Sequence, residues 1–215
     1  MPLPAIDVAY LEIIAESLSR AFDDVRANSP VVVASGSEAE VTALLETRLN
    51  ALLEQDPFWG QLVMCVVRGK ETVSFDGSHL EKRPDLSIYL SNRERNFPLI
   101  AEAKILDSTA AKTETMYCNK GLCRFLDGDY AWANQEAFMV AYVRDGSSIN
   151  GKLVPFLASA MMKTPPLYSV EVLPYPPKSG VGHLACSRHS RSFVYNNQTP
   201  PASPGPINIL HLWLS

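Results

Sequence analysis

The sequence predicts an α/β fold in which a central mixed β-sheet is flanked by helices. Three observations support this prediction. Two amphipathic helical segments open the chain, short apolar runs typical of strands follow them, and strand and helix patterns then alternate toward the C-terminus. Because a sheet must bury its apolar faces against other elements, such alternation favours helices packed on a mixed sheet.

The N-terminal segment predicts two consecutive helices. Residues 5–27 carry apolar side chains at helical spacing, and Asn28-Ser-Pro30 is expected to end this first helix. The second helix is expected to run from Ser35 to about Gln55. Near its start, Ser37 and Glu40 have the three-residue spacing of a capping box.

The middle of the chain predicts the strands of the sheet, and its last third reads differently. Strands are expected at 62–67, 85–90, 98–104 and 137–143, with helices at 119–127 and 153–162. From Thr164 onward, proline, serine and glycine are frequent. This composition predicts irregular connections around two late strands, at 182–187 and 207–214.

Length and composition indicate a single compact unit. The chain has 215 residues, of which 47% are hydrophobic and 20% charged, enough to bury a full core. We expect an N-terminal helical extension over residues 1–34 and one domain over residues 35–215. The formal net charge of −4 excludes a strongly basic protein, so any nucleic acid would have to bind through a local basic patch.

The cysteines and the N-terminus predict a cytoplasmic location. None of the four cysteines forms a C-x-x-C pair, which favours reduced thiols over a zinc site. The N-terminal residues contain acids and no basic segment, unlike a signal peptide. No apolar run reaches the roughly 20 residues that a membrane span needs.

Two acids and a lysine on neighbouring strands form the candidate active site. Asp85 begins one strand, and Glu102 and Lys104 lie two residues apart near the end of the next, so these two side chains share a face. Mg²⁺ prefers oxygen ligands, which the carboxylates of Asp85 and Glu102 and the carbonyl of Ala103 could supply. Lys104 could orient a water or stabilise developing negative charge. The set predicts hydrolysis of phosphodiesters with Mg²⁺, or with Mn²⁺ in its place.

A structural interpretation of the same residues is the alternative. Asp85 could cap a strand, and Glu102 with Lys104 could form an exposed ion pair on an edge strand. The apolar residues that precede Glu102 instead indicate a largely buried strand. Buried charges are costly unless they are paired or bound to a metal, so we favour the functional interpretation.

The arrangement of these residues resembles the PD-(D/E)xK nuclease superfamily. Pro84-Asp85, a hairpin-length gap and Glu102-x-Lys104 match its motif, and the order of helix, three strands, helix and strand over residues 35–143 is similar to its core. The resemblance implies a restriction endonuclease-like fold and a metal-dependent DNA endonuclease, as in restriction or antiviral defence. DNA is favoured over RNA as substrate.

The resemblance also implies further site residues and partners. Members of the superfamily often carry another acid on the helix before the first core strand, for which Glu38 and Glu40 are the candidates. We favour Glu38, because Glu40 is already explained by the capping box; helix-start acids that favour the dipole explain either one equally well. By analogy with restriction enzymes the protein could be a homodimer, or a partner protein could bind its N-terminal helix.

Two groups of basic residues are candidates for nucleic-acid contact. Lys120 and Arg124 are four residues apart on one helix face, beside the expected site. Arg188, His189 and Arg191 follow a late strand and could contact the backbone of a nucleic acid. A solvated surface is the alternative interpretation of both groups.

Two functions therefore remain in competition. The first is a metal-dependent endonuclease, which hydrolyses phosphodiester bonds of DNA. The second is a catalytically silent nuclease-like scaffold that binds nucleic acid or protein as a subunit of a larger complex. The presence of all three residues of the motif favours the first. Small-molecule enzymes have little support, because the chain lacks a glycine-rich phosphate loop and the G-x-S-x-G and H-E-x-x-H motifs.

Overall fold

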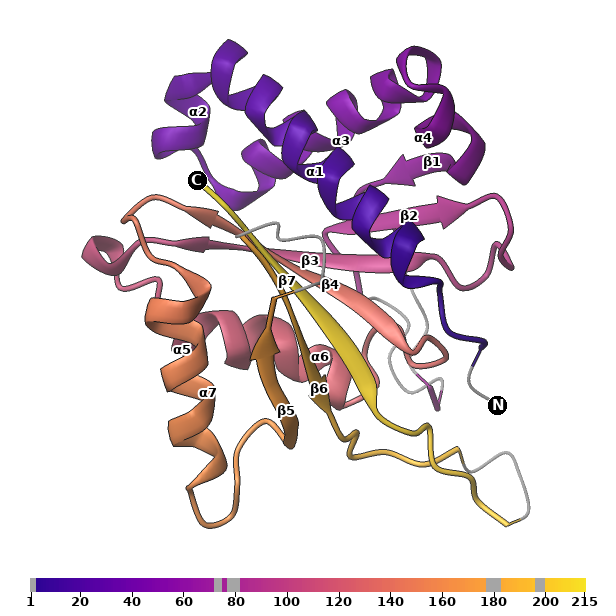
Figure 1. Ribbon diagram of the computed structural model, residues 1–215, viewed down its shortest axis with the longest axis vertical. Helices are drawn as coiled ribbons and strands as arrows, with labels where there is room; N and C mark the ends of the chain where they lie inside the picture. The colour runs from indigo at the N-terminus through magenta and orange to yellow at the C-terminus, as the bar shows by residue number, and fades with distance from the viewer. Residues whose placement is uncertain (1–2, 72–74, 77–81, 177–182, 196–199) are drawn as a thin grey trace.

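The described part of the chain forms one seven-stranded sheet with helices on both faces. The computed structural model describes residues 3–71, 75–76, 82–176, 183–195 and 200–215 (Figure 1). The helices are α1 (Val8–Asn28), α2 (Pro30–Ser35), α3 (Glu38–Gln55), α4 (Pro57–Leu62), α5 (Glu114–Tyr117), α6 (Cys123–Leu126) and α7 (Val154–Met161), with the 3₁₀ turn η1 (Ser108–Ala110) and the π-helical turns η2 (Cys118–Leu122) and η3 (Ile149–Leu153). The strands are β1 (Val63–Val67), β2 (Leu86–Leu90), β3 (Leu99–Leu106), β4 (Glu136–Val143), β5 (Val170–Tyr175), β6 (Leu184–His189) and β7 (Ile207–Leu214).

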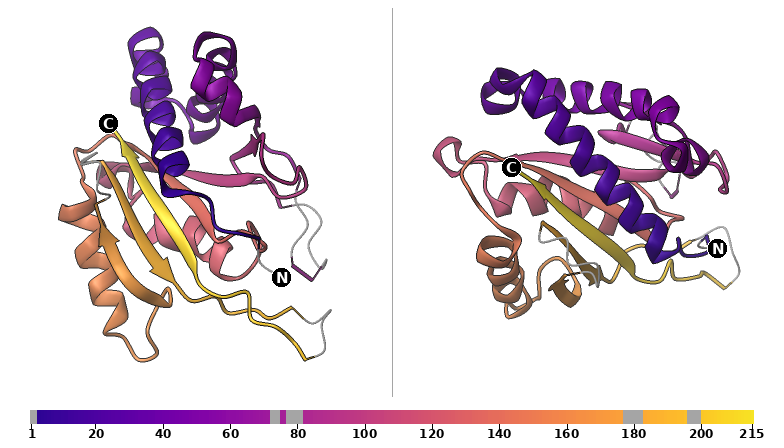
Figure 2. Two further views of the ribbon diagram at one scale, coloured as in Figure 1. Left: turned by 45° about the vertical axis from the view of Figure 1, so that its right-hand side comes forward. Right: turned by 45° about the horizontal axis from the view of Figure 1, so that its top comes forward.

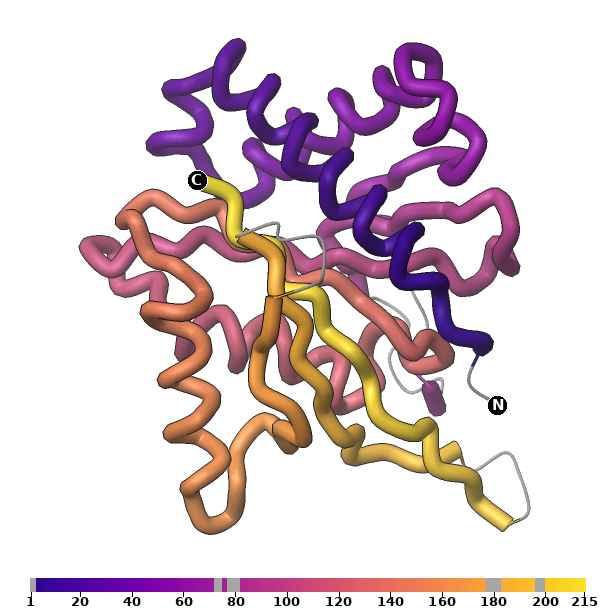
Figure 3. Tube along the Cα trace, in the orientation of Figure 1, coloured from indigo at the N-terminus to yellow at the C-terminus, as the bar shows by residue number. Residues whose placement is uncertain are grey.

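The sheet is mixed, which confirms the predicted α/β class. Its strand order is β1-β2-β3-β4-β7-β6-β5. The central strands β3, β4 and β7 are parallel to one another, whereas β1 and β2 on one side and β5 and β6 on the other are antiparallel to their neighbours. Figure 3 shows β7, the last element of the chain, running through the middle of the sheet.

Each face of the sheet is covered by a different part of the chain. Helices α1 and α3 bury apolar side chains against one face, in a core cluster that includes Leu18, Leu45 and Leu49. The segment from α5 to α6 and helix α7 cover the other face, in a cluster that includes Tyr117 and Phe125. Figure 2 shows the two helical layers separated by the sheet. This arrangement buries both faces of β2, β3 and β4.

The N-terminal helix packs on the rest of the fold. The ring of Phe22 on α1 stacks on Tyr142 of β4, with centroids 5.7 Å apart. The capping box predicted for the next helix is present: the Ser37 hydroxyl accepts from the Glu40 amide, and the Glu40 carboxylate accepts from the Ser37 amide. No helix in the described ranges combines the length and hydropathy that a membrane crossing requires.

Several elements differ from the sequence-based expectations. Pro30, which was expected only to end the first helix, also begins α2, and Pro57 begins α4. At the first position of a helix the missing N–H of proline is harmless. Strand β5 was not predicted in the proline-rich region. It lies at the sheet edge, where Pro174 is tolerated because the edge needs fewer backbone donors.

Candidate active site

The candidate site lies where β2 and β3 separate. Their pairing ends at Leu86 and Ala101, while β3 continues for five residues with only β4 beside it. Beyond that point β3 has an open edge on the side of β2. Carboxylates occupy this edge: Asp85 Oδ2 accepts from the Ala103 amide at 2.8 Å.

A second carboxylate reaches the same edge from a helix. Glu38 is the first residue of α3, and its Oε2 accepts from the Ile105 amide at 3.2 Å. Asp85 and Glu38 therefore complete backbone hydrogen bonds that a longer β2 would have made. This local role explains how both acids are held in place.

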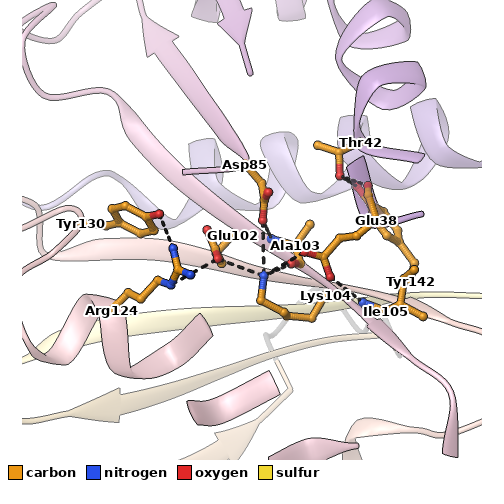
Figure 4. Close-up of polar contacts among 10 residues, drawn as sticks. All are labelled: Glu38, Thr42, Asp85, Glu102, Ala103, Lys104, Ile105, Arg124, Tyr130 and Tyr142. Atoms are coloured by element: carbon orange, nitrogen blue, oxygen red, sulfur yellow. Dashed lines mark hydrogen bonds and ion pairs between the residues drawn. The ribbon is translucent and has the colours of Figure 1, made fainter. Parts of the chain in front are cut away.

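Lys104 lies at the centre of three carboxylates. Its Nζ is 3.1 Å from Glu38 Oε1, 3.0 Å from Glu102 Oε1 and 3.5 Å from Asp85 Oδ2, and it also donates to the Ala103 carbonyl (Figure 4). The lysine side chain is only 12% exposed. We call Glu38, Asp85, Glu102 and Lys104 the fork cluster.

Glu102 is the most buried acid of the fork cluster and is incompletely satisfied. The residue is 2% exposed, and its Oε2 accepts no hydrogen bond from any residue that the structure describes. Burial raises the pKa of the Glu102 carboxyl to about 7, and the charge of Asp85 adds to this effect; Lys104 opposes it without cancelling it. Two cations, Lys104 and Arg124, face Oε1 of this carboxyl group, whereas its buried Oε2 lacks a hydrogen-bond donor among the described residues.

The charge of Lys104 is fixed by its neighbours. Burial alone would lower the pKa of the ammonium, but Glu102, Asp85 and Glu38 outweigh that effect and raise it. Lys104 is thus a cation at neutral pH. It can donate hydrogen bonds to a water or a phosphate oxygen.

A glycine lets the neighbouring helix approach Glu102. Gly121 lies in the π-helical turn η2, and a Cβ at this position would be 2.4 Å from Met139 Cε and 3.6 Å from Glu102 Cγ. The helix expected at 119–127 is thus interrupted by a wider turn where it faces the site. Such π turns are frequent at functional sites.

Arg124 extends the site along the sheet. Its Nε lies 3.7 Å from Glu102 Oε1, and its Nη1 donates to the Tyr130 hydroxyl at 2.5 Å. The structure therefore brings Arg124 to the predicted acids. Lys120, its predicted companion, is exposed to solvent on the same segment, and its contact with nucleic acid stays a prediction.

The second basic group has a different setting from the one predicted. His189 is fully buried, with hydrogen bonds to the Ser187 hydroxyl and the Tyr168 carbonyl, so its predicted contact with nucleic acid is wrong. Strand β6 extends two residues beyond its expected end and so includes His189. Side chains alternate along a strand, and the His189 side chain falls on the buried face. Arg191 donates to the backbone carbonyls of Gly205, Pro204, Trp132 and Asn134, which gives it a structural role. Arg188 is exposed in an ion pair with Glu171.

Two residues that support the site were not predicted. The Thr42 hydroxyl donates to the Glu38 carbonyl at 2.7 Å and lies 3.0 Å from the Tyr142 hydroxyl. These bonds fix the start of α3 against β4 (Figure 4). Thr42 could have been predicted from its position four residues after Glu38, which places both side chains on the same face of the helix.

The fork cluster gathers carboxylates at the open edge of β3 but does not by itself enclose a metal ion. In the described ranges, no group of three or more His, Cys, Asp and Glu side chains has the geometry to hold a metal ion by itself. Mg²⁺ commonly binds through only one or two carboxylates plus water and substrate phosphate. Asp85 and Glu102 provide two carboxylates near the Ala103 carbonyl, with the Lys104 ammonium in contact with all three. Glu102 Oε2 is buried and accepts no hydrogen bond from the described residues.

Comparisons of this chain with protein-family models, with curated proteins and with solved structures found no match. The functional argument therefore depends on the geometry of the fork cluster.

Proposed function

We propose that the protein is a metal-dependent endonuclease that hydrolyses phosphodiester bonds of DNA at the fork cluster. The observation that carries this proposal is the partnerless buried oxygen of Glu102 beside Asp85 and Lys104. The acid-acid-lysine set agrees with the resemblance to PD-(D/E)xK nucleases. A bound Mg²⁺ or Mn²⁺ would neutralise phosphate oxygens and lower the pKa of an attacking water.

In this proposal each residue of the fork cluster has a separate role. Asp85 and Glu102 would hold the metal ion, with the Ala103 carbonyl as a further oxygen ligand. The Lys104 ammonium would orient the water and stabilise the charge that develops on the phosphate. Glu38 keeps the ammonium in position through its 3.1 Å contact. Arg124, which is 36% exposed at its side chain, would contact an adjacent phosphate.

One observation favours a second candidate function. Lys104 already contacts all three acids of the fork cluster, so much of their charge is balanced without a metal. Such a cluster would suit a catalytically silent scaffold that binds DNA or a protein partner. The two candidates differ in turnover: the scaffold binds its partner without cleaving any strand.

The test is cleavage of plasmid and oligonucleotide DNA by purified protein with Mg²⁺, Mn²⁺ or EDTA. We expect cleavage with either metal ion and none with EDTA. The Glu102→Gln variant keeps the shape of the side chain and should lose cleavage, because an amide is a poor ligand for Mg²⁺. Metal-independent cleavage, or full activity of this variant, would contradict the proposal.

The matched control is Glu40→Gln. Glu40 is an acid on the same helix as Glu38, but its carboxylate is engaged in the capping box with Ser37. Glutamine also serves in a capping box, so this variant should fold and cleave normally. Equal losses in both variants would point to a general effect of removing negative charge.

A further inference from the structure

A cavity opens on the same face of the sheet as the fork cluster. Its volume is about 370 Å³, within the usual range of small-molecule sites. Ile100 lines this cavity and lies two residues before Glu102 on β3, so both side chains point to the same face. Two residues of a strand span roughly 7 Å. The cavity therefore adjoins the fork cluster.

Aromatic rings form part of the cavity wall. Phe97 and Trp132 meet edge to face, with centroids 5.2 Å apart and planes at 90°. Phe97 belongs to the connection between β2 and β3, and Trp132 to the segment before β4. Both side chains are partly exposed. Such rings are the surfaces on which proteins stack nucleobases.

Cationic groups lie at the edge of the same cavity. Lys70 and Arg95 are exposed lining residues. The ammonium of Lys70 donates to the Tyr89 hydroxyl at 2.6 Å and lies 4.9 Å from the centre of the Tyr89 ring. The acidic lining residue Glu71 is paired with Arg83. The cavity thus combines ring surfaces with positive charge, which suits a base linked to a phosphate.

A buried amide supplies the most specific observation. Asn134 lines the cavity, is 1% exposed and donates from Nδ2 to the Pro98 carbonyl at 2.8 Å. Because a carbonyl only accepts, this bond fixes the orientation of the amide. The Oδ1 atom is buried and accepts no hydrogen bond from the described residues. An N–H donor of a ligand would satisfy this oxygen.

We propose that this cavity, which we call the base cavity, binds one unpaired nucleobase of the DNA strand that passes the fork cluster. The base stacks on the Phe97 ring and meets the perpendicular Trp132 ring with its edge, Asn134 Oδ1 accepts a base N–H, and Lys70 and Arg95 contact the adjoining phosphate. The inference deepens the proposed function and rests on it. It specifies the substrate as DNA with unpaired nucleotides, since a base within a duplex cannot enter a cavity.

The test compares two single-stranded probes of equal charge. One is fluorescein-labelled dT8, and the other is an eight-residue abasic strand with the same backbone; binding is measured by fluorescence anisotropy in EDTA, so that no cleavage occurs. We expect wild-type protein to bind dT8 about tenfold more tightly than the abasic strand, in the range of a single base–aromatic stack. Fully paired duplex DNA should bind like the abasic strand.

Variants assign the preference to the base cavity. Phe97→Ala should bind both strands equally, at the affinity that wild type shows for the abasic strand. Lys70→Ala should weaken binding of both strands alike, because it removes only a phosphate contact. The matched controls are Phe58→Ala, which removes an aromatic side chain that is 77% exposed on α4, and Lys152→Ala, which removes an exposed cation on η3. Both should behave as wild type.

The outcomes separate this inference from the proposed function. Equal affinity of wild type for the two strands, or a base preference that survives Phe97→Ala in folded protein, overturns the base cavity. Cleavage with Mg²⁺ under either result leaves the nuclease proposal standing. A base preference that Phe97→Ala abolishes, in a protein that cleaves no DNA with Mg²⁺ or Mn²⁺, supports the base cavity and overturns the nuclease.

Discussion

Two polar clusters, one partly and one almost completely buried, lie on the same face of the sheet and differ in how well their polar atoms are satisfied. One is the fork cluster. The other, which we call the histidine cluster, comprises Tyr117, Ser187, His189 and His211 and is almost completely buried. The fork cluster carries four formal charges, and one of its buried oxygens has no hydrogen-bond partner in the part of the chain that the structure describes. The histidine cluster leaves none of its side-chain polar atoms without one.

The histidine cluster forms a continuous chain of hydrogen bonds. His189 Nδ1 must donate to the Tyr168 carbonyl at 2.8 Å, so its Nε2 accepts from the Ser187 hydroxyl at 2.7 Å. The same hydroxyl then accepts from His211 Nε2 at 2.7 Å, so His211 Nδ1 accepts from the Tyr117 hydroxyl at 2.9 Å. The Met139 carbonyl lies at the same distance from that hydroxyl, 2.9 Å, and competes for its single proton. Both imidazoles are neutral in this arrangement. Burial lowers the pKa of His189 to about 4 and that of His211 well below its usual value.

The difference between the clusters indicates that the histidine cluster stabilises the fold and that the fork cluster binds a ligand. A network whose members satisfy one another needs nothing from outside and rigidifies the fold. A buried carboxylate oxygen without a partner is costly, and it persists where a ligand completes the site. We therefore expect changes in the histidine cluster to affect stability and changes in the fork cluster to affect activity.

The largest expected effect is on cleavage in Lys104→Met. This variant removes the ammonium that we assign to the water and the phosphate, and we expect a loss of roughly 100- to 1000-fold in cleavage rate. The measurement is the single-turnover rate on an oligonucleotide with Mg²⁺. Lys152→Met, at an exposed lysine of η3, is the control and should keep the wild-type rate. A loss below threefold in Lys104→Met would remove the lysine from the mechanism.

The converse effect is expected for His211→Leu. This variant leaves the Ser187 hydroxyl and the Tyr117 hydroxyl without their shared partner, and we expect a loss of about 3 kcal/mol in unfolding free energy. Urea denaturation measures this loss. The cleavage rate of the folded fraction should stay within about twofold of wild type. A folded variant with no activity would show that the histidine cluster belongs to the site.

A pH dependence of stability is expected from His189. Its pKa is about 4 in the folded protein, below the ordinary value of 6.5, because burial disfavours the charged ring. The unfolded state therefore binds a proton first as the pH falls, and stability is lost between pH 6.5 and 4. We expect His189 to account for about 2 kcal/mol of the loss between pH 7 and 5.

The control for this pH dependence is His189→Leu, which cannot take up the proton. Its unfolding free energy should be lower at pH 7, because Tyr168 and Ser187 lose a hydrogen-bond partner. The unfolding free energy of the variant should, however, fall less steeply between pH 7 and 5. Denaturation curves at both pH values give the two slopes. Parallel slopes for wild type and variant would show that other groups cause the acid sensitivity.

A smaller effect is expected for Gly121→Ala. The added methyl group would lie 2.4 Å from Met139 Cε, at the flexible end of that side chain, and 3.6 Å from Glu102 Cγ. We expect a destabilisation of about 1 kcal/mol from the overpacking. We also expect a several-fold lower cleavage rate, because the displaced Met139 side chain shifts the Glu102 side chain. Met139→Ala in the same chain removes the clashing atoms and should restore part of the rate.

Local signals predicted most of the fold. Strand β7 was expected at its observed bounds, because its apolar run is bordered by Pro206 and the chain end. The capping box predicted at Ser37 and Glu40 is present, although α3 begins at Glu38 and not at the expected Ser35. By contrast, β5 shows no alternation of buried apolar and exposed polar residues, because Val172 and Tyr175 are exposed as well as Glu171. Its strand character comes from pairing with β6. Tertiary pairing of this kind is not visible in a local pattern.

The candidate site could be predicted in part. The spacing of Glu102 and Lys104 and the favoured choice of Glu38 agree with the observed cluster. The sequence did not predict that pairing of β2 with β3 would stop at Leu86. This stop leaves the open edge of β3 whose amides donate to Asp85 and Glu38. The burial of His189 was missed because the basic residues beside it suggested a surface loop.

The most direct test of the nuclease proposal is calorimetric titration of the protein with Mn²⁺ in the absence of DNA. We expect one Mn²⁺ site per chain in wild type and in the capping-box control Glu40→Gln, and no site in Glu102→Gln, because that substitution removes the carboxylate with the partnerless oxygen. Absence of Mn²⁺ binding in wild type, or binding that persists unchanged in Glu102→Gln, would contradict the assignment of the fork cluster as a metal site.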